Sequence, residues 1–392
     1  MQHKLNNPVL VLPSWYPNKI DNFAGDFIQR HVKAIALYVP QYIIHFVKDE
    51  HGIITKDVHS EICNYENYTE EIIYYYPAKT GAKYLDRFIS YLKFTKLYKK
   101  NINRYFKDNE NTTLVHVHVA LMAGIIATWI KQKFKVPFIL SEHWTIYLPQ
   151  SNHQIKNLNL IYQKHLREIL KKALIVTVVS NYLGNAIQQV YPFIQYKKIP
   201  NVVDTSLFYP LTIEQKSGTK FIHASLMNYQ KNVEGICYAA KIAKDKGYQF
   251  SLDLFGPIQN SIKELIATLK LNNIIFLRGE VPQSFLASKL QLADALILYS
   301  RFETFGCIII EAQACGLPVI TSDLQIFEEI ISPGINGLFA KENTPSDLAE
   351  VMMNYCENKN YFTKSIIAQT AEKYSYAIIG KEFESLYKLQ KK

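Results

Sequence analysis

Short apolar runs alternate with amphipathic stretches along nearly the whole chain of 392 residues. The runs are almost continuous in valine, isoleucine, leucine and phenylalanine, as buried strands of parallel sheets are. The stretches between them carry apolar side chains at helical spacing. This alternation predicts βαβ units, and therefore parallel sheets covered by helices on both faces. We predict strands at residues 9–12, 43–47, 114–119, 138–140, 174–179, 220–224, 250–255, 274–277, 295–299 and 318–321. We predict helices at residues 27–37, 85–106, 123–133, 158–172, 232–243, 262–269, 282–290, 308–314, 345–355 and 361–373.

The alternation pauses once, near the middle of the chain. Residues 198–204 read Lys-Ile-Pro-Asn-Val-Val-Asp, and the polar stretch 212–219 precedes the next predicted strand. We place a domain junction here, with residues 1–200 in the first domain and 205–374 in the second. The predicted fold is α/β, with two Rossmann-like, doubly wound parallel sheets. Such sheets bind ligands at the carboxyl ends of their strands, so we expect a cleft where the two domains face each other.

Composition and cysteine usage narrow the class of protein. Hydrophobic residues make up 48% of the chain and charged residues 20%, which excludes a disordered protein. The five cysteines are widely spaced and form no C-x-x-C pair, which argues against a disulfide framework and favours a reducing compartment. The first residues show no signal-peptide pattern, and the longest near-apolar stretch, 114–130, is short for a membrane span. We therefore expect a cytoplasmic protein.

The basic charge is confined to the first half. Residues 1–200 hold 25 Lys and Arg against 14 Asp and Glu, whereas residues 201–392 hold 19 against 20. Most of the excess lies in residues 79–107, where nine basic residues face the single Asp86. Such asymmetry predicts an anionic partner for the first half only. We expect no nucleic-acid partner, because no recognition motif accompanies the charge.

The strongest chemical signal is the segment 300–320. The predicted strand 295–299 ends in a loop with Glu303, and Gly306 then opens a helix that carries Glu311. Backbone N–H groups at a helix start suit a diphosphate, and a carboxylate can accept two hydrogen bonds from the vicinal hydroxyls of a sugar. Two other interpretations remain: a helix-start carboxylate with a surface charge, or the acid pair of a glycosidase. The neighbouring diphosphate-type site favours a sugar donor.

This segment resembles the donor-site signature of the retaining glycosyltransferases of family 4, in the GT-B superfamily. Six further segments resemble that family in the same order along nearly the whole chain. They are Leu-Pro-Ser-Trp-Tyr-Pro at 12–17 with Gly25-Asp26-Phe27-Ile28 and His31, Val-His-Val-His at 115–118, Ser-Glu-His-Trp at 141–144, Ile-Pro-Asn-Val-Val-Asp at 199–204, Ser225-Leu226 with Lys231-Asn232, and Pro-Gly-Ile-Asn-Gly-Leu at 333–338.

The resemblance implies a GT-B fold with donor binding in the second domain and acceptor binding in the first. It implies transfer from a nucleotide-diphosphate sugar, UDP- or GDP-linked, with retention and with no other cofactor and no metal. It also implies that the last helix, 376–392, packs back on the first domain. The roles it implies are Glu311 on the ribose, Glu303 on the sugar, Thr304 and the N–H groups of Phe305, Gly306 and Cys307 on the donor, Lys231 on the diphosphate, Gly25 in close approach to the phosphate, and His118 at the reacting carbon.

The chain departs from the family pattern at three positions. Ser225 stands where the family usually has Arg, Ala24 precedes Gly25 where two glycines are common, and Val202 replaces a Gly. The first departure removes one cation from the expected diphosphate site. It keeps a second hypothesis open, a catalytically silent partner of a glycosylation complex. Another GT-B activity, a sugar-nucleotide epimerase or a phosphorylase, is the third.

Histidines supply the candidate residues of the first domain. His116 and His118 alternate on a predicted strand and face the same side. A metal pair there lacks a third ligand at suitable spacing, so we predict no metal site. We assign His143 and Trp144 to the acceptor or the cleft, with a packed core histidine as the alternative for His143. Tyr74-Tyr75-Tyr76 could stack on sugars, but a strand or a sheet edge explains them better.

The basic stretch 79–107 also carries an apolar stripe. Leu85, Phe88, Ile89 and Leu92 share one helical face, and lysines lie elsewhere. In one interpretation this stripe packs on the first domain and the basic face is solvated. In the other, the basic face contacts anionic headgroups at the inner face of the membrane, near a cell-envelope or lipid-linked acceptor. The sequence names neither the nucleotide base, the sugar, the acceptor, the linkage nor the oligomeric state.

Overall fold

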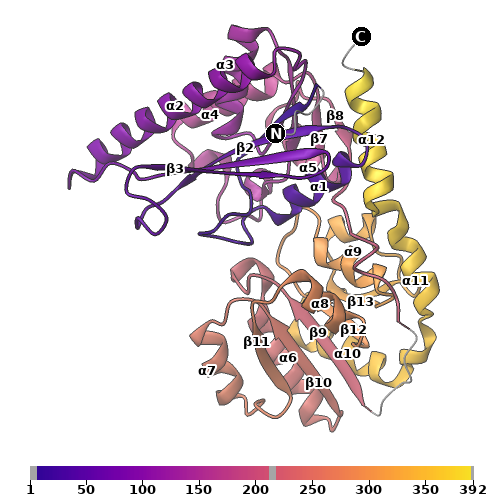
Figure 1. The fold of residues 1–392 in the computed structure, drawn as a ribbon. Helices are drawn as coiled ribbons and strands as arrows, with labels where there is room; N and C mark the ends of the chain where they lie inside the picture. Colours follow the sequence, from indigo (N-terminus) through magenta and orange to yellow (C-terminus); the bar gives the residue numbers. More distant parts are fainter. Residues whose placement is uncertain (1–6, 212–217, 390–392) are drawn as a thin grey trace. The chain divides into compact units, whose positions relative to one another are not determined.

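The computed structural model describes residues 7–211 and 218–389, which form two compact units (Figure 1). The first unit is Met1–Pro200 together with Tyr376–Lys392, and the second is Asn201–Ser375. Most of the polar stretch expected at 212–219, and the end of the last helix beyond Leu389, lie outside the described residues. Each unit is built on one sheet, and every pair of neighbouring strands but one is parallel in the described part of the chain.

The first unit is built on an eight-stranded sheet. Its strands are β1 (Val9–Pro13), β2 (Gln41–Lys48), β3 (Val58–Asn64), β4 (Tyr68–Tyr75), β5 (Val115–His118), β6 (Phe138–Glu142), β7 (Val176–Val178) and β8 (Tyr196–Lys198). They lie in the order β3-β4-β2-β1-β5-β6-β7-β8, with β3 antiparallel to β4 at the edge. Every residue of β1 is buried, as its apolar run predicts. The order reverses between β1 and β5, which is where doubly wound sheets bind ligands.

Six helices of the described residues belong to this unit. They are α1 (Asp26–Ala36), α2 (Lys83–Asp108), α3 (Ala123–Phe134), α4 (Leu160–Lys172), α5 (Asn181–Val190) and α12 (Tyr376–Leu389). The last of them, α12, packs against α1 although almost the whole chain separates the two in sequence (Figure 1). A Cβ atom on Gly380 would overlap the carbonyl oxygen of Ala34, so the absence of a side chain permits this close approach.

The second unit has a six-stranded parallel sheet in the order β11-β10-β9-β12-β13-β14. Its strands are β9 (Thr219–Ala224), β10 (Phe250–Phe255), β11 (Ile275–Gly279), β12 (Ala295–Leu298), β13 (Val319–Ser322) and β14 (Gly337–Ala340). Its helices are α6 (Val233–Asp245), α7 (Asn260–Thr268), α8 (Gln283–Leu290), α9 (Cys307–Ala314), α10 (Pro345–Asn358) and α11 (Lys364–Ala371). This is the strand order of a dinucleotide-binding sheet, with its switch point between β9 and β12.

The apolar pattern missed strands that lack a continuous apolar run. Strand β4 is buried at every position, yet it contains Glu70 and Glu71, which interrupt its pattern. Glu71 is held inside by Arg104 and by the hydroxyl of Tyr42. Strand β3 is exposed along most of its length, and strands β8 and β14 are short. The pattern also missed helix α5, which contains Gly184. The expected helix at 361–373 is α11 between two 3-10 turns.

Helix α2 packs differently from the expected pattern. Its second half carries the packed side chains, among them Phe94, Tyr98 and Ile102. In its first half Phe88 is 60% exposed and Leu92 is 49% exposed. The basic stretch therefore packs on the first domain, as one of the two interpretations has it, but not through the expected stripe: Leu85, Phe88 and Leu92 are exposed, and Ile89 is half-buried. The stripe faces solvent, because aromatic side chains nearer the C-terminus of the helix, such as Phe94 and Tyr98, are the ones that pack and so determine which face is buried.

Two smaller expectations were also checked. Tyr74 and Tyr75 are buried in β4, so they belong to the packed interior and not to a sugar-stacking surface. Among the described helices, each is either too short or too polar to cross a lipid bilayer.

Candidate functional site

The loop after β12 forms the candidate donor site of the second unit. Gly306 has φ of 91° and caps the start of α9. A side chain here would be strained because L residues rarely adopt this backbone conformation. Backbone N–H groups at a helix start generally point out of the helix end; in α9 the N–H of Ile309 donates to the carbonyl of Gly306 at 2.9 Å. Phe305 beside it is buried and contacts the ring of Tyr374 edge-on at 5.8 Å.

Glu303 is held in this loop by three side-chain partners. It is 5% exposed and pairs with the ammonium group of Lys231. The hydroxyl of Ser300 donates to it at 2.9 Å, and the amide nitrogen of Gln230 donates at 3.1 Å. The two residues expected to hold the sugar and the diphosphate are therefore paired with each other. A helix-start carboxylate would bond to backbone N–H groups, whereas the partners of Glu303 are side chains.

Glu311 lies in the second turn of α9 and is 4% exposed. That burial excludes the interpretation of Glu311 as a surface charge. Burial raises the pKa of the nearby Cys315 thiol to about 12, and the charge of Glu311 adds to the shift. Thr304 and Cys307 are both half-buried on the same loop and helix start.

Ser225, the position without the expected arginine, is part of a local hydrogen-bonded turn. Its hydroxyl lies 2.7 Å from Nε2 of His223 and accepts the backbone N–H of Met227 at 2.9 Å. His223 is fully buried, and burial lowers its pKa to about 4. Arg301, on the donor loop, is engaged elsewhere: it pairs with Glu234 at 2.7 Å and stacks over the ring of Tyr229. The position that is cationic in the family is thus an uncharged one in this chain.

A cavity of about 460 Å³ lies beside the same loop. Its walls include Ser300, Arg301, Asn232 and Ser322, but neither Lys231 nor Glu303. It therefore adjoins the predicted donor residues without being lined by Lys231 or Glu303: Ser300 in its wall donates to Glu303.

In the first unit, the carboxyl ends of β1, β5 and β6 bring the candidate residues together. His118 is the last residue of β5, and it pairs with Pro13 on one side and Ser141 on the other. Trp144 follows β6, and its ring meets that of Trp15 edge-on at 5.7 Å. The parallel register accounts for this gathering, since all three strands end at the same edge of the sheet.

Gly25 precedes α1 and is held tightly by the first loop. Its φ is 61°, and a Cβ atom would lie 2.6 Å from the carbonyl carbon and oxygen of Trp15. Packing within the first unit therefore requires glycine here. This requirement is independent of the phosphate approach that the family resemblance implies.

Glu142 anchors the turn that carries His143 and Trp144. Its carboxylate accepts the backbone N–H of His143 at 3.1 Å and the hydroxyl of Tyr147 at 3.0 Å. It also accepts the N–H of Ala120 at 3.2 Å, so it ties the loops after β5 and β6 together. Burial raises its pKa to about 7 despite these hydrogen bonds. The sequence showed this residue only as part of the Ser-Glu-His-Trp motif.

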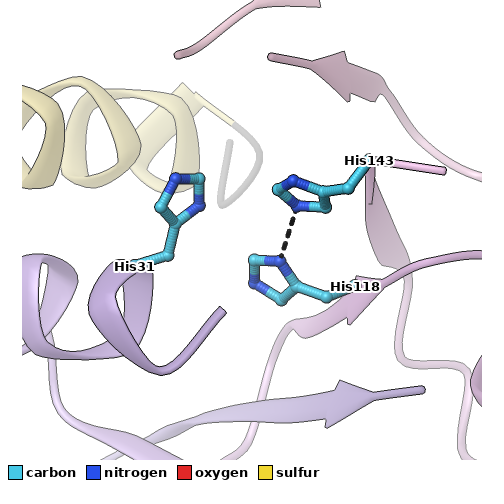
Figure 2. Close-up of side chains that lie close together, drawn as sticks. All are labelled: His31, His118 and His143. Atoms are coloured by element: carbon cyan, nitrogen blue, oxygen red, sulfur yellow. Dashed lines mark hydrogen bonds between the residues drawn. The ribbon is translucent and has the colours of Figure 1, made fainter. Parts of the chain in front are cut away.

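Three histidines converge beside this turn (Figure 2). His118 Nδ1 lies 3.3 Å from His143 Nε2, and His31 projects toward both from α1. One ring nitrogen from each lies within 4.8 Å of the others. His116, which the sequence paired with His118, has both ring nitrogens engaged in hydrogen bonds within the unit. Its Nδ1 lies 2.6 Å from the hydroxyl of Tyr387, and its Nε2 lies 2.7 Å from that of Ser141.

Burial keeps these rings uncharged at neutral pH. It lowers the pKa of His31 to about 3, with the charge of Arg30 adding to the shift. Burial, reinforced by the neighbouring histidines, also holds the pKa of His118 and of His143 well below 6.5. The sequence named His31 only within a motif, because nothing in a helical pattern shows which strand end a helix residue will meet.

The two halves of the chain match two related families. Residues 54–207 match Glycosyltransferase Family 4, and residues 212–388 match Glycosyl transferases group 1. An uncharacterized glycosyltransferase of Methanocaldococcus jannaschii is 27% identical over 306 residues, which cover 78% of this chain and 82% of that protein. N-acetyl-alpha-D-glucosaminyl L-malate synthase of Bacillus anthracis is 26% identical over 256 residues, which cover 62% of this chain and 65% of that protein.

Solved structures share the fold over almost the whole length. Sucrose-phosphate synthase from Thermosynechococcus elongatus matches with a TM-score of 0.76 and 17% identity, covering 97% of this chain and 98% of that one. HepE from Anabaena, in complex with UDP and glucose, matches with a TM-score of 0.68 and 13% identity, covering 97% and 99%. Both have the GT-B fold, so the predicted fold class is confirmed.

Proposed function

The chain belongs to the family 4 glycosyltransferases of the GT-B type, and on that premise we propose a specific reaction for it. Transfer of a glycosyl group is its activity. The proposed reaction moves a sugar from a nucleotide-diphosphate sugar to a cell-envelope or lipid-linked glycan. It retains the anomeric configuration and uses no metal ion.

The pairing of Lys231 with Glu303 at the switch point of the second sheet carries this proposal. A buried cation and a buried carboxylate can each serve one part of a sugar diphosphate. Glu303 accepts hydrogen bonds from sugar hydroxyls, and Lys231 turns to the diphosphate as negative charge develops on the leaving group. The N–H groups of Phe305, Gly306 and Cys307, beside Thr304, receive the remaining phosphate and sugar oxygens. Glu311 binds the ribose.

We assign His118 to the reacting sugar and place His143 and Trp144 with the acceptor. Burial keeps the His118 ring neutral, so it acts by hydrogen bonding and not as a charged acid. Gly25 lets the first loop approach the donor phosphate closely, and its lack of a Cβ atom also avoids a clash with the backbone of Trp15. The acceptor residues belong to the first unit and the donor residues to the second.

The nucleotide of the donor is UDP or GDP, and UDP is the first to test. HepE was solved with UDP-glucose, with a TM-score of 0.69 to this chain. TarM, which covers 70% of this chain with a TM-score of 0.57, was solved with UDP and alpha-GlcNAc-glycerol. Both likenesses lie below 20% identity, so they support the choice of donor to test and not the donor itself.

We also propose contact between α2 and an anionic membrane surface. Phe88, Leu92 and the 84% exposed Tyr84 present apolar side chains to solvent. The basic side chains Lys96, Lys99, Lys100, Arg104 and Lys107 line a groove further along the same helix. Apolar side chains beside lysines are typical of helices that lie in the headgroup region. Such contact would bring the enzyme to a lipid-linked acceptor.

Transfer from UDP- and GDP-linked sugars, with and without EDTA, tests the reaction. We expect product from either the UDP-linked or the GDP-linked sugar but not from both, and we expect EDTA to leave the rate unchanged. NMR should show the same anomeric configuration in donor and product. Glu303→Gln should lower kcat by about 100-fold or more, because the sugar loses an ionised acceptor. The surface variant Lys241→Met, in the same unit, should leave kcat unchanged. Inversion of configuration, or loss of activity in EDTA, would contradict the proposal.

The same assay separates the alternatives. An epimerase would release a changed nucleotide sugar without an acceptor, and a phosphorylase would require inorganic phosphate. A silent partner would show no turnover with any donor, and Glu303→Gln would then leave the activity of the complex unaltered.

Sedimentation with vesicles tests the membrane contact. The chain should bind vesicles rich in anionic lipid and should not bind neutral ones. Phe88→Ser should weaken this binding without changing the melting temperature, because the side chain is exposed. The matched exposed variant Tyr361→Ser, on the second unit, should leave it unaltered. Equal binding of the Phe88 variant would overturn the assignment to α2.

A further inference from the structure

We propose that His31, His118 and His143 form a zinc-binding site in the first unit. The three side chains come from α1, from the end of β5 and from the turn after β6, and Figure 2 shows their rings converging on one space. No group of three His, Cys, Asp or Glu side chains elsewhere in the described residues meets the same geometric test.

The spacing of the rings fits tetrahedral coordination. Two nitrogens bound to zinc at about 2.0–2.1 Å lie about 3.3 Å apart. His118 Nδ1 and His143 Nε2 are 3.3 Å apart already. The three ligand atoms all lie within 4.8 Å of one another, so tetrahedral coordination requires the His31 nitrogen to move closer to the other two. When both rings face an ion, the proton shared by His118 and His143 moves to the outer nitrogen of the ring that donates it.

The other ring atoms are not committed to holding the fold. His118 Nε2, His143 Nδ1 and both nitrogens of His31 are buried, and none makes a hydrogen bond of ordinary geometry to a described residue. The carbonyl of Pro200 nevertheless interacts with the His31 ring, as backbone carbonyls do with metal-bound histidines. His116, in contrast, has both nitrogens satisfied and lies outside the set.

The chemistry of the site selects the ion. Neutral imidazole nitrogens suit zinc and other late divalent metals, whereas Mg²⁺ and Ca²⁺ require oxygen ligands. Phe27 and Phe383 flank the site: their ring centroids lie 4.8 Å from that of His143 and 5.5 Å from that of His31, respectively. Three protein ligands leave a fourth position for water or an anion.

Occupation of the site would silence the enzyme. This part rests on the proposed function, in which His118 hydrogen-bonds to the reacting sugar. With zinc on Nδ1 and the proton on Nε2, the His118 ring can still donate a hydrogen bond to the sugar but can no longer accept one, and the ion fixes the positions of His118 and His143. Zinc is then an inhibitor of a reaction that itself needs no metal.

Binding is tested on the full chain with Zn²⁺ alone, in competition with a chromophoric chelator. We expect one tight ion per chain. His31→Gln and His143→Gln should each weaken it by at least about 100-fold, since even outer-shell losses cost 10–100-fold. The exposed His153→Gln is the matched control and should bind like the wild type. The spectrum of bound Co²⁺ should show tetrahedral coordination in the wild type, which needs no variant to fold.

The outcomes keep the two proposals apart. Absence of a stoichiometric ion, or binding that survives both cluster variants, overturns the zinc site whatever the transfer assay shows. Inhibition of transfer at the zinc concentration that fills the site supports the inhibitory role. A filled site with unchanged transfer overturns that role and leaves the proposed reaction standing.

Discussion

The two units place their candidate residues at the same point of similar sheets but use opposite electrostatics. In the second unit the switch point between β9 and β12 carries an ionised pair, Lys231 and Glu303. In the first unit the switch point between β1 and β5 leads to His118 and its neutral histidine neighbours. A diphosphate requires a cation, whereas a metal ion held by imidazoles requires uncharged ring nitrogens. The scaffold therefore sets the location, and the side chains set the chemistry.

The net charge of the two halves does not follow this difference. The first half carries the whole basic excess, yet its candidate site is uncharged. The excess lies on α2, away from the strand ends, with Lys96, Lys99 and Lys100 on one groove. Overall charge thus describes a surface of the first unit and not its site.

Lowering the pH should destabilise the first unit more than the second, and this is the largest difference that we expect between them. Of the six buried histidines in the described residues, only His223 belongs to the second unit. Burial lowers the pKa of His31 to about 3 and of His45 to about 4, so below pH 6.5 the unfolded chain takes up protons that the folded chain does not. Each such histidine costs about 2 kcal/mol at pH 5.

Glu142 opposes this trend, since its raised pKa stabilises the fold at low pH and the contribution is lost as the pH rises through about 7. One opposing group does not offset five histidines. Hydrogen exchange at pH 7.5, 6 and 5 should show β5 losing protection before β12. Equal protection of both strands at pH 5 would contradict the comparison, and His153→Gln should leave the profile unchanged.

Removing the cation of the second unit should have the next largest effect. Lys231→Met deletes the charge that we assign to the leaving group, and it leaves Glu303 with Ser300 and Gln230 only. Steady-state kinetics should show kcat falling about 100- to 1000-fold, or about 3–4 kcal/mol of activation free energy. Lys241→Met is again the control. A kcat within tenfold of the wild type would assign the leaving-group role to another cation.

A glycine of the first unit tests whether its loop is held by packing. Gly25→Ala places a methyl group 2.6 Å from the backbone of Trp15 at a positive φ. We expect a loss of about 2–4 kcal/mol in the free energy of unfolding. Gly81→Ala also has positive φ, but it faces open space and should cost about 1 kcal/mol. Urea denaturation compares the two, and equal losses would show that the contact with Trp15 relaxes.

The smallest effect concerns the departure from the family at Ser225. Ser225→Ala removes the hydroxyl that His223 and the N–H of Met227 contact, which should cost about 1 kcal/mol of stability. The KM for the donor should stay within about twofold, because the hydroxyl is engaged in its own turn. A large rise in KM would show instead that Ser225 contacts the donor.

Local patterns along the chain were sufficient to predict much of this protein. The order of strands and helices, the GT-B fold and the loop from Ser300 to Gly306 follow from apolar periodicity, from glycine at a strained turn and from motif resemblance. These features depend on residues that are near one another in sequence, where hydrophobic spacing and backbone preference act directly. The same reasoning placed Lys231 and Glu303 in one site.

Only the tertiary structure decided which distant side chains meet. The pairing of Lys231 with Glu303, the burial of Glu70 and Glu71 in β4, and the exposure of Phe88 depend on how elements pack. His31 joins His118 and His143 because α1 lies across the ends of β5 and β6, and no local pattern encodes that contact. Such sites form only when strand order and helix packing bring together residues that are far apart in the sequence, so local patterns do not predict them.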